Sequence, residues 1–150
     1  MTYAHSRAIN AYRTANSAVS PIKAVAMLLD EALNAIILTS YHLRRKDFEN
    51  AFGRVVHASK ILSGLRQNVS MDADPVMGQQ FIDMYTSNIF ALHNAYGKDD
   101  AIQRYATIAS GILEFRNAWA EMAKMQQRNI DSVMSGILDQ SDASMLAKVG

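Results

Sequence analysis

The sequence of 150 residues contains no cysteine, which excludes disulfide bridges, thiolate zinc sites and cysteine nucleophiles. It has only two prolines, Pro21 and Pro75, which directly follow Ser20 and Asp74, as is typical where helices begin. No apolar run approaches the ~20 residues that span a membrane. Residues 1–16 also lack the apolar block of a secretory signal. We therefore expect no membrane insertion and a cytoplasmic location, which the absence of cysteine also fits.

The sequence also lacks an excess of charge of either sign, because 15 basic and 14 acidic side chains leave a formal net charge of +1. A face that binds nucleic acid needs a larger excess of Lys and Arg. The one basic run, Arg44-Arg45-Lys46, can touch a phosphate or an acidic partner. We favour the simpler prediction that it caps a helix end, where the dipole favours positive charge, and keeps that end solvated. We predict that no nucleic acid is bound.

Motifs that carry chemistry are missing as well. Di-iron bundles use Glu-x-x-His pairs, and no glutamate here is followed by histidine three residues later. The four histidines, His5, His42, His57 and His93, share no metal-ligand spacing. A phosphate-binding glycine loop and a hydrolase elbow are also absent. We predict that the protein is not an enzyme and holds no metal and no cofactor; a metal- or cofactor-holding bundle is the competing hypothesis.

What the sequence does have is helical periodicity over most of its length. Apolar residues recur at steps of three and four, and no strand-like alternation occurs. We predict an all-α fold, an antiparallel up-and-down four-helix bundle at 20–125 between an N-terminal arm at 1–19 and a C-terminal short helix and tail at 126–150. The expected helices are 21–44, 48–67, 75–95, a fourth that Asp99 or Asp100 caps and that carries Ile102 to Met122, and a fifth that carries Ile130, Val133 and Ile137 and ends before Ser141.

Local signals add detail to the second and third helices. Asp47 and Asp74 stand where side chains cap helix starts, and Gly97 supplies a left-handed residue after the third helix. The main apolar stripe predicted for the second helix is Phe48, Phe52, Val55, Ser59 and Leu62, widened along one edge by Ala58, Ile61 and Leu65.

Three glycines lie inside the expected helices, at Gly53, Gly64 and Gly111. Each costs about 1 kcal/mol relative to alanine in a helix. Close packing between neighbouring helices is the first explanation. The second is a shallow helix surface that a guest chain can approach closely.

Several motifs, in this order and spacing, resemble the flagellar export chaperone family, FliS. The resemblance covers the chain from about Tyr12 to Met125. Leu29 and Glu31 stand where the family usually has tyrosine and glycine, so the chain resembles a divergent member. The motifs are Tyr12, Ser20-Pro21, the run Met-Leu-Leu-Asp-Glu-Ala at 27–32, Met84-Tyr85, and the close formed by Leu113, Phe115-Arg116 and Ala118-Trp119.

The resemblance implies a cytoplasmic chaperone that binds the disordered C-terminal segment of flagellin and prevents premature polymerisation. It also implies delivery of flagellin to the cytoplasmic part of the flagellar export gate. In the family the N-terminal arm can cover part of the client surface, and here Tyr12, with Ile9 beside it, is the candidate plug. Permanent packing of Tyr12 on the bundle is the competing interpretation. A helical adaptor or regulator that binds another protein's amphipathic helix is the alternative function.

The resemblance leads us to expect a client-binding surface of apolar and aromatic residues: Tyr12, Ile22, Leu29, Ile61, Leu65, Phe81, Tyr85 and Trp119. Each of them can equally be a core residue, because every helix of a bundle buries an apolar stripe. The apolar face formed by Ile130, Val133 and Ile137 can pack in cis, pair with a second copy or cover the client groove. All three arrangements stay open from the sequence, and so does the oligomeric state.

Overall fold

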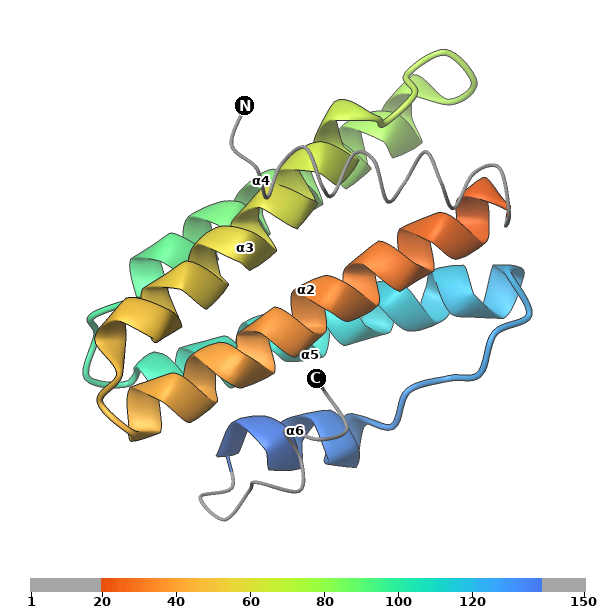
Figure 1. Ribbon diagram of the computed structural model, residues 1–150. Coiled ribbons are helices and arrows are strands. Elements are labelled where there is room, and N and C mark those ends of the chain that lie inside the picture. The colour runs from red at the N-terminus through yellow and green to blue at the C-terminus, as the bar shows by residue number, and fades with distance from the viewer. Residues whose placement is uncertain (1–19, 139–150) are drawn as a thin grey trace.

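The computed structural model describes residues 20–138, which form five helices and no strand (Figure 1). The predicted all-α bundle with a short C-terminal helix is confirmed. The predicted arm, with Ile9 and Tyr12, lies outside the described residues. The helices are α2 (Pro21–Arg44), α3 (Phe48–Gln67), α4 (Pro75–Ala95), α5 (Ala101–Met122) and α6 (Ile130–Leu138).

Short-range signals set where most of these helices begin and end. Gly97 adopts a left-handed φ of 85° after α4, as predicted. At α5 the N-cap residue is Asp100, one of the two predicted positions, but the expected capping hydrogen bond is absent because the Asp100 carboxylate accepts from Arg104 Nε at 2.7 Å. At the other three long helices a side-chain oxygen accepts a backbone N–H: Ser20 from Lys23 at 3.2 Å, Asp47 from Asn50 at 3.3 Å and Asp74 from Met77 at 3.0 Å.

The four long helices pack as an antiparallel ring in the order α2, α3, α4, α5 (Figure 1). Helix α2 packs against both α3 and α5 and supplies twelve buried residues, whereas α4 supplies four. Toward the end of the bundle where α5 begins, the buried hydroxyl of Tyr105 donates to the Leu92 carbonyl at 3.0 Å and ties α5 to α4. The core is therefore centred on α2, and α4 is its least covered wall.

The predicted stripe of α3 is wrong at its first two positions. Phe48 and Phe52 are 56% and 46% exposed, while Ala51 is fully buried in their place. The buried face of α3 is thus rotated at its start relative to the prediction, and contacts with Tyr96, which follows α4, account for this rotation. Its ring packs edge-on against Phe52 at 5.3 Å, and its hydroxyl donates to the Phe48 carbonyl at 3.0 Å. The contact with Tyr96 thus keeps at the surface of α3 the two aromatic residues that the pattern assigned to the core.

The prediction for the basic triplet is wrong for Arg44. Arg45 and Lys46 are exposed, as expected, and the Arg45 guanidinium lies 4.4 Å from the centre of the Tyr41 ring. Arg44 instead turns toward α6. Its guanidinium donates to the carbonyls of Ile137 and Gly136, the latter at 3.4 Å. The side chain therefore joins the C-terminal ends of α2 and α6.

Candidate functional site

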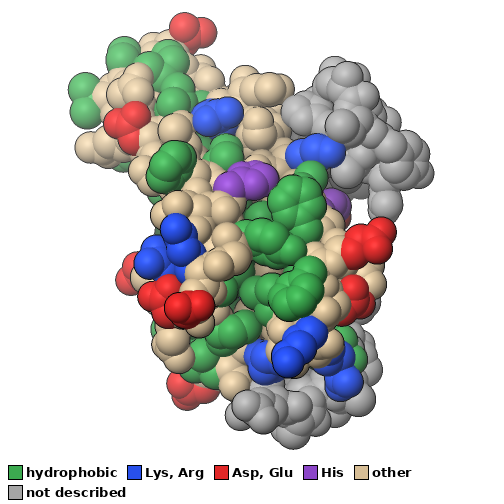
Figure 2. Space-filling model, turned by 90° about the vertical axis from the view of Figure 1, so that its left-hand side faces the viewer, with side chains coloured by type: hydrophobic (Ala, Val, Ile, Leu, Met, Phe, Trp, Pro, Cys, Tyr) green, Lys and Arg blue, Asp and Glu red, His purple; other side chains and the backbone are tan. Residues whose placement is uncertain are grey.

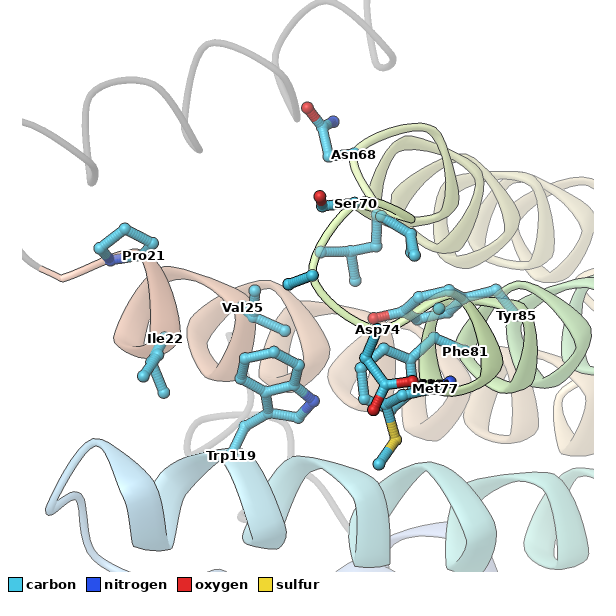
Figure 3. A pocket seen from close by; sticks show the side chains of 14 residues that line it. Pro21, Ile22, Val25, Asn68, Ser70, Asp74, Met77, Phe81, Tyr85 and Trp119 are labelled. Carbon is cyan, nitrogen blue, oxygen red and sulfur yellow. Dashed lines mark hydrogen bonds between the residues drawn. The ribbon is translucent and has the colours of Figure 1, made fainter.

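An apolar pocket opens at the end of the bundle where α2 begins and α5 ends (Figure 3). It has a volume of about 320 Å³ and is walled by the first turns of α2, the 68–74 loop and the first half of α4. Figure 3 shows Trp119 rising from α5 toward Val25 of α2, with Phe81 and Tyr85 of α4 beside it. All four long helices contribute to this one concave surface.

Five of the residues predicted for the client surface line this pocket: Ile22, Leu65, Phe81, Tyr85 and Trp119. Ile22 is 36% exposed at the rim, whereas Leu65 and Tyr85 are buried at the floor. The fold therefore brings together side chains that lie up to 97 positions apart (Ile22 to Trp119). Their contact with a client stays a prediction.

The other three predicted residues are placed differently. Leu29 and Ile61 are each 1% exposed, belong to the central core and do not line the pocket. A guest would reach them only after the core had opened. Tyr12 lies outside the described residues. The predicted client role of these three also stays untested.

Sequence reasoning missed several lining residues, among them Val25, Val69 and Met77. Val25 follows Ile22 by three positions, so helical spacing was a signal that could have found it. Met77 lies in the first turn of α4 and is 45% exposed. Nothing in the local pattern separates Met77 or Val69 from ordinary apolar residues, because their place in the pocket depends on where α2 begins and α5 ends.

An aromatic cluster, formed by Phe81 and Tyr85 of α4 and Phe115 and Trp119 of α5, fills the seam behind the pocket. The ring centres of Phe115 lie 5.4 Å from Phe81, 5.8 Å from Tyr85 and 6.0 Å from Trp119. Three of these pairs meet edge to face, the arrangement that ring quadrupoles favour. These bulky rings form the contact between α4 and α5 here and give the pocket a largely apolar wall.

The polar groups of the pocket are few and do not form a reactive set. The carboxylate of Asp74 accepts the Met77 backbone N–H at 3.0 Å and so caps α4. Elsewhere His57 Nε2 lies 2.9 Å from Glu31 Oε1, and His93 Nε2 lies 3.0 Å from Ser59 Oγ. No cluster of three or more potential metal ligands occurs within residues 20–138. The pocket is suited to burying apolar side chains of a guest.

The glycines of the helices bear on how closely a guest can approach. Among the described residues, a Cβ added at Gly53, Gly64 or Gly111 meets nothing within 4 Å, so close helix packing does not explain them. Gly78 of α4 is different. A Cβ there would lie 2.6 Å from Met71 Sδ and 3.0 Å from the Ser70 carbonyl. Glycine at 78 therefore lets the 68–74 loop close one side of the pocket.

A second apolar surface lies at the opposite end of the bundle, beside the α2–α3 and α4–α5 connections. Figure 2 shows this end of the molecule, with hydrophobic side chains gathered near the middle and charged ones around them. A cavity of about 300 Å³ here is lined by Phe48, Tyr96 and Ile102 together with Arg44 and Lys98. This surface is more polar than the first pocket because charged residues form part of its wall.

Comparison with known proteins gives one match. The family model described as "Flagellar protein FliS" matches residues 5–126, which is most of the chain and includes the four long helices. Neither curated proteins nor solved structures gave a match. Within residues 20–138, none of the helices has the length and apolar character needed to cross a membrane.

Proposed function

Because this chain belongs to the FliS family of flagellar export chaperones, we propose that its client is the disordered C-terminal segment of flagellin. In the cytoplasm the protein holds this segment, prevents premature polymerisation and helps present flagellin to the cytoplasmic part of the export gate. The family assignment made from the sequence motifs is confirmed by the match over residues 5–126. The identity of the client and its delivery to the export gate are what we propose.

The observation that supports this client is the apolar pocket of about 320 Å³ formed by the four long helices and the 68–74 loop. Its mainly apolar lining suits the apolar side chains of a guest segment. A disordered segment that carries apolar residues at helical spacing is the kind of guest that such a groove binds. Ile22 and Met77 stand exposed at the rim, where such a guest would first make contact.

Release follows from the same physics. A segment that folds on binding loses part of its interaction free energy to ordering, so a large contact area remains compatible with moderate affinity. Contact with the export gate can then transfer the client without nucleotide hydrolysis. Until that transfer, the free energy gained by binding in the pocket needs only to exceed the free energy that the segment loses on ordering.

Calorimetric titration with the C-terminal segment of flagellin from the same genome tests the proposal. We expect a saturable one-to-one complex and a negative heat-capacity change, the mark of apolar burial. Trp119 is the sole tryptophan and lines the pocket, so its fluorescence should shift on binding. Absence of both heat and fluorescence change would refute flagellin as the client and leave the helical adaptor as the function to test.

A matched pair of variants locates the contact on α2. Ile22 and Met27 are 36% and 45% exposed on the same helix, but only Ile22 lines the pocket. We expect Ile22→Asp to cost about 2 kcal/mol of binding, roughly 30-fold in Kd, by losing apolar burial. Met27→Asp should change Kd by less than about twofold. Equal effects of the two variants would place the contact elsewhere.

A further inference from the structure

Residues 123–138 are bound to the outer face of α2 and α5 as an extended stretch followed by α6 (Figure 1). The family match ends at residue 126, so α6 lies beyond the family core. Val133 and Ile137, one turn apart on α6, are 1% and 0% exposed. Of the three arrangements left open by the sequence, packing in cis is the one observed. Residues 123–138 of the chain itself therefore occupy this face, as a bound guest segment would.

The extended stretch is held through its backbone. The Asn117 side-chain amide donates to the Arg128 carbonyl at 3.0 Å and accepts the Arg128 backbone N–H at 3.0 Å. Arg116 donates to the Gln126 carbonyl at 2.8 Å. These contacts bind main-chain groups, so they fit an extended segment of almost any sequence. Arg116 and Asn117, adjacent residues in the C-terminal part of α5, thus bind the backbone of the segment.

Charge adds a preference at one position of the segment. Asp30 of α2 accepts from Arg116 at 2.8 and 3.1 Å and from Arg128 Nη1 at 3.1 Å. Arg116 belongs to the bundle, whereas Arg128 belongs to the bound segment. Asp30 therefore offers an acceptor to a basic residue located just before the helical part of whatever occupies this face.

Arg44 fixes the other end of the site. Its guanidinium donates to the carbonyls of Gly136 and Ile137, at the C-terminal end of α6. A cation at this end also interacts favourably with the helix dipole. Since Arg128 lies at Asp30 and Ile137 at Arg44, the segment runs parallel to α2. The face thus specifies an extended stretch, a basic residue and a short helix of defined direction.

We propose that the α2–α5 face is a second guest-binding face, which residues 123–138 fill in cis and a helical segment of the client fills in trans. This inference rests on the proposed function, because it takes both faces to serve the same client. A stable interface buries about 1,200–2,000 Å², more than a pocket of one or two side chains supplies. The guest segment has a basic residue near its start and apolar residues at i and i+4. Displacement of the tail is then part of loading.

The test detaches α6 in the full chain without changing the face beneath it. Val133→Asp with Ile137→Asp places charges at the buried positions, and Ile130→Asp with Leu138→Asp places them at positions 49% and 43% exposed. We expect the first variant to bind the flagellin segment about tenfold more tightly, since the competing tail no longer occupies the site. The second variant should match the unaltered chain. Unchanged or weaker binding by the first variant would overturn the inference.

Two further measurements keep this test decisive. Circular dichroism should show cooperative unfolding of the first variant; if it does not fold, Arg128→Glu replaces it, since a carboxylate against Asp30 also loosens the tail. A synthetic peptide of residues 123–138 should bind the tail-detached chain saturably and the unaltered chain at least tenfold more weakly, and failure to bind the former would also refute the second face. If the flagellin segment binds none of the proteins, the proposed function fails; if it binds all of them equally, only this inference fails.

Discussion

Arg116 offers the clearest test of how the bundle and its tail are held together. Its side chain is 5% exposed and donates to both carboxylate oxygens of Asp30, at 2.8 and 3.1 Å. It also donates to Asn117 Oδ1 at 2.9 Å and to the Gln126 carbonyl at 2.8 Å. Replacing it with methionine removes the charge and all of these bonds. The aliphatic stem is kept, so little packing is lost.

The loss of stability in Arg116→Met depends on the contacts that Asp30 keeps after the substitution. Removing one partner of a buried ion pair costs about 3–5 kcal/mol. Asp30 keeps Arg128 at 3.1 Å, and its side chain is 25% exposed, so water relieves part of the loss. We therefore expect the lower end of that range, about 3 kcal/mol of unfolding free energy. For a domain of this size, the melting temperature should fall by about 6–12 °C.

Urea unfolding, followed by circular dichroism and by Trp119 fluorescence, measures this change. The control is Arg104→Ala, because the Arg104–Asp100 pair has side chains 44% and 59% exposed. Exposed pairs contribute about 0–1 kcal/mol, so this variant should be close to the unaltered protein. A cost below about 1 kcal/mol for Arg116→Met would show that the network of Asp30, Arg116 and Gln126 contributes little to the stability of the fold.

Two further predictions concern the glycines and a buried tyrosine. Gly78→Ala should destabilise the fold by about 1 kcal/mol or more, because the added Cβ crowds the Ser70 carbonyl. Gly53→Ala should stabilise it by up to about 1 kcal/mol, because the added Cβ meets nothing within 4 Å. Thermal unfolding compares the two variants, and a change of stability in the same direction for both would contradict the geometry. Burial raises the pKa of Tyr105 above its ordinary value of 10.0. Its contribution to stability is therefore full below pH 10 and declines as the pH rises through 10, where the unfolded chain ionises. Tyr105→Phe should lose about 1–2 kcal/mol with the bond to Leu92 and show a weaker decline in urea unfolding at alkaline pH; an equal decline would exclude Tyr105 as its source.

The helices were predictable because their limits are encoded by short-range signals. Ser20, Asp47 and Asp74 each accept a backbone N–H three residues later, and Gly97 takes the left-handed conformation that the sequence indicated. The rotation of α3 was not predictable in this way. It depends on Tyr96, a residue distant in sequence, whose contacts with the start of α3 keep Phe52 at the surface.

The pocket was predictable in kind but not in extent. Aromatic residues such as Tyr85 and Trp119 were assigned to a binding surface, and they do line one pocket. Leu29 has the same apolar character but lies in the core, since exposure depends on where helices separate and not on residue type. The role of Arg44 was out of reach, because its partner Ile137 lies 93 residues away.

The sparse burial of α4 has a consequence for motion. Only four of its 21 residues are buried, and beside the pocket it meets α5 through aromatic rings. Segments with few buried contacts open at a lower free energy than the whole domain, and hydrogen exchange detects such partial opening. The amides of α4 should therefore exchange before those of α2. If the pocket holds the proposed guest, α4 is the long helix whose opening would admit it, while α2, α3 and α5 stay packed.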